Sequence, residues 1–153
     1  MSDSKVSRAS DHEYFVDTNI FLRIIVKDDE KKAADCEKVI EAIRKGALRA
    51  ITSHLVLAEV VWTCLSLYRI AKSDVARLGR GIISIHHLSF HDDFDALRAL
   101  SYYDEYSVKF IDALIASHAR IARGEVEILS YDTDFDKMGI ARVEPCDVLK
   151  GVS

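Results

Sequence analysis

The sequence predicts an α/β domain with a mainly parallel central sheet of about five strands, and two observations support this fold class. Short apolar runs alternate along the chain with longer segments in which apolar residues recur three and four positions apart. The 153 residues, 49% of them hydrophobic and 30% charged, match the size and composition of one globular domain. We therefore expect a single domain over residues 14–149, preceded by a polar, disordered lead-in over residues 1–13.

The predicted strands are apolar runs bounded by polar or turn-forming residues. They cover residues 14–16, 48–52, 85–90, 126–130 and, more weakly, 142–144. Apolar residues at helical spacing predict helices over residues 19–27, 33–43, 54–68, 73–83, 93–103 and 108–123. Ser53 and Ser107 are suitable N-caps, and Gly46 and Gly124 stand where helices commonly end. Strands and helices therefore alternate from end to end.

The composition argues against several classes of protein. A net charge of −4 disfavours broad coating of nucleic acid, which needs many Lys and Arg contacts to phosphates, but it is compatible with a nuclease. The three cysteines form no C-x-x-C pair, so neither a zinc site nor a disulfide framework is expected. The first residues include no apolar stretch of the length found in signal peptides, and no segment approaches the roughly 20 apolar residues that would span a bilayer. We therefore expect a cytoplasmic protein that does not contact a membrane.

Two acids follow predicted strands closely. Asp17 comes directly after the first strand, and Asp132 comes just after the run at 126–130. If both runs are parallel strands, both carboxylates emerge at the edge where open α/β sheets bind ligands. Each acid taken alone is slightly better explained as a helix cap or a turn residue.

Two further acids lie among apolar residues in predicted helices. Glu59 shares a helical face with Leu55 and Trp62, and Asp112 shares one with Ile115. A charge on an apolar face is costly unless it is paired or binds a metal. A buried salt bridge, or an apolar stripe that lies elsewhere on the helix, would explain one such acid. For two, together with the two strand-end acids, shared metal ligation is the better explanation.

Carboxylates in such a group suit a hard divalent cation. Mg²⁺ prefers oxygen ligands and keeps several waters, so a few carboxylates are enough to bind it. Such an ion lowers the pKa of bound water, orients a scissile phosphate and stabilises charge on the attacking and leaving oxygens. The four acids therefore indicate a shared site for a divalent metal ion.

At these acids the sequence resembles the PIN-domain family, especially the VapC-like ribonuclease toxins of toxin–antitoxin pairs. Residues 14–22, Tyr-Phe-Val-Asp-Thr-Asn-Ile-Phe-Leu, are similar to the opening strand and the Asp-Thr-Asn signature of that family. Ser53 with Glu59 resembles its second acidic element, residues 110–116 its third and residues 130–136 its fourth. The match covers about residues 14–145 in family order and spacing, and the four elements together are specific.

The resemblance implies a three-layer α/β/α sandwich of the PIN type. It implies a Mg²⁺- or Mn²⁺-dependent endoribonuclease that cleaves single-stranded or loop RNA with metal-activated water, as the toxin of a type II toxin–antitoxin system. It also implies a homodimer silenced by a small antitoxin protein. The catalytic and metal-binding quartet implied by the resemblance is Asp17, Glu59, Asp112 and Asp132, with Thr18 and Asn19 supporting it through hydrogen bonds.

The fourth acidic element leaves a choice, because Asp132, Asp134 and Asp136 alternate. Asp132 is preferred for its place at the strand end, and Asp134 ranks second as a metal ligand. The same run does not match a calcium EF-hand loop, because Lys137 replaces its glycine and Val143 its final glutamate.

Other functions remain as alternatives. Asp17 also suits the nucleophile of a haloacid-dehalogenase-type phosphatase, but that class needs a second Asp at the position of Asn19. A housekeeping RNA-processing PIN nuclease and a non-catalytic PIN interaction module are the two stronger alternatives. The complete acidic quartet argues against the non-catalytic module.

Three other groups of residues have a functional and a structural interpretation. Arg23 is a candidate phosphate contact near the metal, with a surface ion pair as the alternative. The tyrosines at 102, 103 and 106 are suited to stacking on RNA bases but more often pack a helix end. The histidines at 86, 87 and 91 have no fixed spacing to the acids, which favours a surface or structural role.

Overall fold

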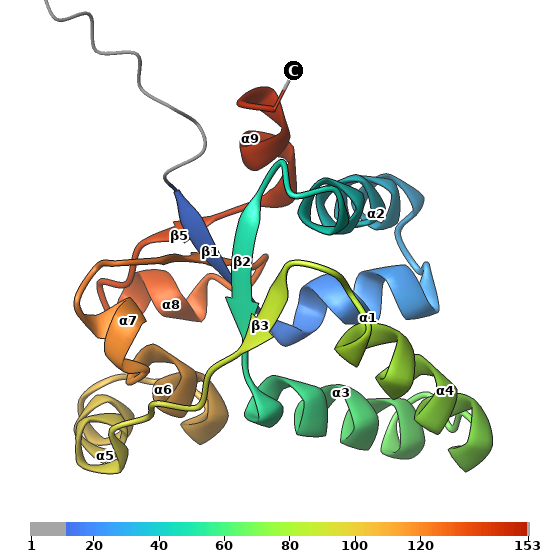
Figure 1. Ribbon diagram of the computed structural model, residues 1–153. Helices are drawn as coiled ribbons and strands as arrows, with labels where there is room; N and C mark the ends of the chain where they lie inside the picture. The colour runs from blue at the N-terminus through green and yellow to red at the C-terminus, as the bar shows by residue number, and fades with distance from the viewer. Residues whose placement is uncertain (1–11, 153) are drawn as a thin grey trace, which may run out of the picture.

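A computed structural model describes residues 12–152, and its centre is one five-stranded sheet with helices on both sides (Figure 1). The strands lie in the order β3-β2-β1-β4-β5, and all four neighbouring pairs are parallel. They are β1 (Glu13–Val16), β2 (Arg49–Thr52), β3 (Leu88–Phe90), β4 (Glu127–Leu129) and β5 (Arg142–Val143). The predicted α/β fold with a parallel sheet of about five strands is therefore confirmed.

Two groups of helices flank the sheet (Figure 1). The first group is α1 (Thr18–Val26), α2 (Glu30–Arg44), α3 (His54–Ser66), α4 (Lys72–Ile83) and α9 (Pro145–Lys150). The second group is α5 (Ala96–Glu105), α6 (Phe110–Ala116), α7 (Ala119–Ala122) and α8 (Asp134–Lys137). Helices pack within each group, for example α1 against α2 and α5 against α6. Within residues 12–152 no helix is long and apolar enough to span a bilayer.

The two central strands form the middle of the core. Phe15 and Val16 of β1 and Ile128 and Leu129 of β4 are fully buried. Strands covered by helices on both faces are apolar throughout rather than alternating, which is why these runs were recognisable in the sequence. The buried Thr52 hydroxyl donates to the carbonyl oxygen of Val16 at 2.8 Å and ties the ends of β1 and β2 together.

The helix predicted over residues 108–123 is two helices, α6 and α7, and this prediction is wrong at Ser117 and His118. His118 is fully buried and caps α7, because its Nδ1 accepts from the Arg120 amide at 3.3 Å. Its Nε2 therefore carries the proton and donates to the His91 carbonyl oxygen at 3.2 Å. Burial lowers the pKa of His118, which keeps the ring neutral. The predicted N-cap at Ser107 is also wrong, since α6 begins after Lys109.

Smaller differences lie at the ends of elements. The short helices α8 and α9 were not predicted, and the strand predicted over residues 85–90 has only its last three residues. Residues 1–11 of the predicted disordered lead-in lie outside the described residues. Glu13, its last residue, belongs to β1 and pairs in register with Arg49.

Candidate metal centre

The parallel sheet brings Asp17 and Asp132 to the same edge. Asp17 follows β1, and its amide donates to the Leu129 carbonyl oxygen at 3.1 Å, at the end of the neighbouring strand β4. Asp132 lies in the short connection from β4 to α8. The expectation that both carboxylates emerge at the carboxyl ends of strands therefore agrees with the geometry.

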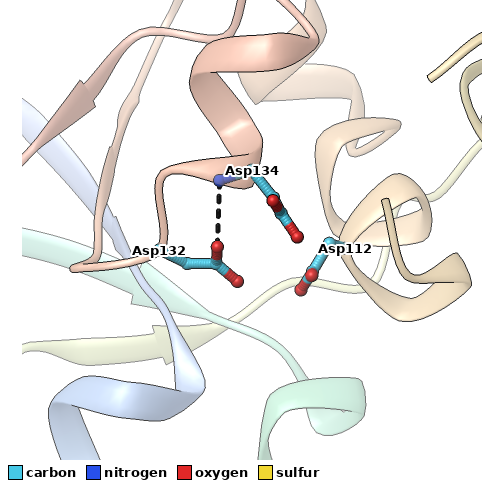
Figure 2. A group of neighbouring side chains, drawn as sticks. All are labelled: Asp112, Asp132 and Asp134. Atoms are coloured by element: carbon cyan, nitrogen blue, oxygen red, sulfur yellow. Dashed lines mark hydrogen bonds between the residues drawn. The ribbon is translucent and has the colours of Figure 1, made fainter. Parts of the chain in front are cut away.

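Three carboxylates converge at this edge. Asp112 lies on α6, Asp132 follows β4, and Asp134 is the first residue of α8. One carboxylate oxygen from each lies within 4.8 Å of those of the other two. Figure 2 shows the three side chains pointing into a common space, with the Asp134 amide donating to Asp132 Oδ1 at 2.9 Å. We call these three residues the acidic cluster.

Asp112 is the most perturbed member of the acidic cluster. Its side chain is 6% exposed, and its Oδ2 has no hydrogen-bond partner within residues 12–152. Burial, followed by the charges of Asp132 and Asp17, raises the pKa of Asp112 to about 8. No Lys, Arg or His within the described part of the chain forms an ion pair with it. A buried acid without a cation is unfavourable by itself and indicates a site for an external positive charge.

Asp17 is buried next to the acidic cluster and held by two side chains. Ser130 Oγ donates to its Oδ2 at 2.6 Å, and Asn19 Nδ2 donates to the same oxygen at 3.2 Å. Burial raises the pKa of Asp17 to about 6, although the Ser130 hydrogen bond acts in the opposite direction. The charges of Glu59 and Asp132 also raise it.

Glu59 lies beside this group but outside the 4.8 Å cluster. It is half-buried on α3, and its charge raises the pKa of both Asp17 and Asp112, which places it within electrostatic reach of the site. The four predicted acids are therefore within electrostatic reach of one another, and Asp112 and Asp132 are the two of them that belong to the acidic cluster.

Ser130 connects the elements of the site through hydrogen bonds. No sequence pattern indicated this role. Its hydroxyl accepts from Asn19 Nδ2 at 2.8 Å and from the Asp132 amide at 3.0 Å, in addition to its bond to Asp17. Asn19 Oδ1 also accepts from the Tyr131 amide at 3.2 Å, so Asn19 makes hydrogen bonds to Asp17, Ser130 and Tyr131. Thr18 differs, because its buried Oγ1 has no hydrogen-bond partner among the described residues.

The three alternating acids have different surroundings. Asp132 and Asp134 face Asp112, and Lys137 Nζ approaches Asp134 Oδ1 to 2.8 Å. Asp136 instead points to Arg142, which donates to both of its carboxylate oxygens at 3.0 Å. Asp136 is thus engaged by a cation, whereas Asp132 is not.

The remaining candidates lie apart from the acidic cluster or have structural partners. Arg23 forms an ion pair with Asp28 at 2.9 Å, which was the alternative to a phosphate contact. His86 and His87 are exposed and pack against each other, with ring centroids 4.7 Å apart. The tyrosines pack at helix ends, as in the pairs Tyr102–Tyr106 and Tyr103–Phe110.

The donors present fit a divalent cation. They are carboxylate oxygens, which are hard ligands, and the buried Asp112 Oδ2 lacks any other partner. Burial and the neighbouring carboxylates raise the pKa values of Asp112 and Asp17, and a bound cation would oppose this shift by favouring the ionised forms.

The family model of the PIN domain matches residues 14–141. The chain belongs to the PIN domain family. The resemblance found in the sequence is thereby confirmed, and the parallel five-stranded sheet is that of a PIN domain. A search of curated proteins by sequence found no match.

Solved structures support the PIN fold. The DNA-bound VapBC of Salmonella typhimurium is 18% identical, with a TM-score of 0.63 over 88% of this chain and 99% of that one. The VapBC2 of Rickettsia felis, bound to promoter DNA, is 20% identical, with a TM-score of 0.59 over 86% and 98%. VapC20 of Mycobacterium tuberculosis, a toxin that cleaves the sarcin–ricin loop, is 18% identical, with a TM-score of 0.60 over 85% and 98%.

Proposed function

We propose that this PIN domain is a metal-dependent endoribonuclease that hydrolyses single-stranded or loop RNA at the acidic cluster. One observation carries the proposal: three carboxylates converge within 4.8 Å, and the buried Asp112 Oδ2 among them has no partner in the described chain. Such a group is unfavourable without a cation and matches the ligands of Mg²⁺ or Mn²⁺.

In this proposal Asp112, Asp132 and Asp134 bind the metal directly. Asp17 and Glu59 add negative charge beside them, since the charges of both raise the pKa of Asp112. Asn19 and Ser130 hold Asp17 Oδ2 in a fixed direction through their hydrogen bonds. Two groups that orient one carboxylate are typical of the support that metal ligands receive in proteins.

A bound divalent ion supplies the reactivity, because it lowers the pKa of an attacking water and offsets charge on the scissile phosphate. The carboxylates of the chain orient that water and accept its proton. Hydrolysis of this kind leaves a 5′-phosphate and a 3′-hydroxyl.

We further infer that the protein is the toxin of a type II toxin–antitoxin pair. Its structural neighbours include VapBC toxin–antitoxin complexes and the sarcin–ricin-loop-cleaving VapC20, and that loop is an example of loop RNA. In this account a small antitoxin protein silences the enzyme, which works as a homodimer on RNA in the cytoplasm.

Cleavage of a panel of structured cellular RNAs by the antitoxin-free protein tests the proposal. We expect endonucleolytic products with 5′-phosphate ends in Mg²⁺ or Mn²⁺ and none in EDTA. Asp17→Asn removes charge at nearly constant shape and should lower the rate about a thousandfold, as expected when about 4 kcal/mol of transition-state stabilisation is lost.

Glu13→Gln is the matched control, because it makes the same kind of change at the other end of β1. It should leave the rate unchanged. Equal cleavage by the wild type and Asp17→Asn, or products with 2′,3′-cyclic phosphates, would contradict the proposed mechanism. A folded protein that binds metal but cuts no RNA would favour a non-catalytic PIN module.

A further inference from the structure

Arg142 links the two ends of the segment that carries Asp132 and Asp134. It lies on β5, and its side chain is 14% exposed. Nη1 donates to the carbonyl oxygen of Ser130 at 3.1 Å, before the segment. Nε and Nη2 donate to the two carboxylate oxygens of Asp136, after the segment, both at 3.0 Å. One guanidinium group therefore spans the loop from β4 into α8.

The chemistry of the pair makes this link rigid. A guanidinium group is planar, and its two parallel N–H donors fix both the distance and the angle of a carboxylate. Glu144 Oε2 accepts a further bond from Arg142 Nη1 at 2.9 Å, which holds the guanidinium from the other side. A lysine would offer only a point charge in the same place.

The loop between these two anchors carries hydrogen bonds that set the directions of the site carboxylates. The Asp132 amide donates to Ser130 Oγ at 3.0 Å, and the Asp134 amide donates to Asp132 Oδ1 at 2.9 Å. Ser130 Oγ itself donates to Asp17 Oδ2 at 2.6 Å. A shift of Ser130 relative to Asp136 would therefore move Asp132 and Asp134, which face Asp112 in Figure 2. It would also disturb the hydrogen bond that Ser130 donates to Asp17.

We propose that Arg142 is a positioning residue for the metal centre, which it serves by holding Ser130 and Asp136 at a fixed separation. This inference rests on the proposed metal-dependent function. It assigns a role to Asp136 as well: Asp136 receives the guanidinium and does not bind the ion.

The positive charge of Arg142 and its positioning role predict opposite effects on Mn²⁺ binding. A positive charge near the acidic cluster opposes cation binding, so charge alone predicts that Arg142→Gln binds Mn²⁺ more tightly. Loss of positioning predicts weaker binding. Arg142→Lys keeps the charge but loses the planar fork, so charge alone predicts unchanged binding and positioning predicts weaker binding.

Arg120 provides a matched control at the opposite end of the sheet. It makes the same kind of contact, since Nη1 and Nη2 donate to the two carboxylate oxygens of Glu13 at 2.9 and 3.2 Å. Nε donates to a second acid, Glu125, at 3.2 Å. Arg120→Gln therefore removes a comparable ion pair without touching the loop after β4.

The experiment is a calorimetric Mn²⁺ titration of the wild type and the three variants. We expect the Kd to rise about tenfold or more in both Arg142 variants, the usual effect of losing support behind metal ligands, and to stay unchanged in Arg120→Gln. Unchanged or tighter binding by Arg142→Gln would overturn the inference, as would binding by Arg142→Lys equal to that of the wild type.

Amide hydrogen exchange of residues 130–136 in EDTA gives a second readout that needs no metal. The Asp132 and Asp134 amides should exchange about tenfold faster in Arg142→Lys than in the wild type, with no change in Arg120→Gln. Equal exchange in the wild type and Arg142→Lys would overturn the inference. If the wild type bound no Mn²⁺, the proposed function would fail instead, and the exchange result alone would decide whether Arg142 orders the loop.

Discussion

Glu13 and Asp17 lie at opposite ends of β1, and their carboxylates have opposite surroundings. Arg120 donates to both oxygens of Glu13, and Arg49 lies 3.7 Å away. Asp17 is more deeply buried, yet its neighbours include the carboxylates of Glu59 and Asp132 and no ion-paired cation within the described chain. The hydrogen bond from Arg120 lowers the pKa of Glu13, whereas burial raises that of Asp17 to about 6.

This difference in surroundings distinguishes Glu13, which belongs to a stabilising ion pair, from Asp17, which lies in a candidate binding site. Four residues of strand cover about 13 Å, so the two environments coexist in one small domain. At the amino end of the sheet the chain supplies its own cations. At the carboxyl end Asp134 pairs with Lys137, but Asp17, Asp112 and Asp132 have no ion-paired cation within the described residues. Acids left in this way are unfavourable for folding and are expected where an external ligand completes the charge balance.

Replacing one carboxylate by an amide should have opposite effects on stability at the two ends of the sheet. Glu13→Gln leaves Arg120 without its bidentate partner and should lower the free energy of unfolding by about 1–3 kcal/mol. Asp112→Asn should leave the metal-free protein as stable or more stable, because it removes repulsion within the acidic cluster. Urea unfolding in EDTA measures both changes. A large loss of stability in Asp112→Asn would mean that this acid has a structural partner.

The stability of the metal-free protein should also depend on pH. Folded Asp112 has a pKa of about 8 against an ordinary value of 3.8, so the folded state holds a proton that the unfolded state releases. The stability of the metal-free protein should therefore fall as pH rises from about 4 to about 8. Asp17, whose pKa is raised to about 6, should contribute to the same fall in stability over the lower half of that pH range.

Glu13 affects the pH dependence of stability with the opposite sign. Its pKa is lowered in the folded state, so its contribution to stability is lost only as pH falls. Urea unfolding in EDTA at a series of pH values tests the contrast. Asp112→Asn should flatten the decline towards high pH, and Glu13→Gln should leave that decline in place. A decline that is the same in Asp112→Asn and the wild type would show that other groups cause it.

The sequence predicted the acids at the carboxyl end of the sheet, but it did not predict the hydrogen bonds that support them. Asp17 and Asp132 were recognisable because each follows an apolar strand closely, and Asp112 because it interrupts an apolar helical face. Each of these signals is local. The bond from Ser130 to Asp17 joins residues 113 positions apart, so no local spacing indicated it.

The same reason explains the errors in the fold. Apolar spacing continues across Ser117 and His118, so the sequence predicted one helix over residues 108–123. The break depends on the burial of His118 between Phe15 and Phe94, whose ring centroids lie 5.4 and 5.3 Å away. Those partners come from distant parts of the chain. The helices α8 and α9 were missed because four and six residues are too few to show a helical period.

Binding of Mn²⁺ to the wild type, Asp112→Asn and Glu13→Gln tests the central claim most directly. Calorimetry near neutral pH should show saturable binding to the wild type and to Glu13→Gln, and binding at least about tenfold weaker in Asp112→Asn. The two variants make the same change of charge, so only the position of the lost carboxylate differs. Equal Mn²⁺ binding by the wild type and Asp112→Asn would contradict the account, because the acidic cluster would then not be the metal site.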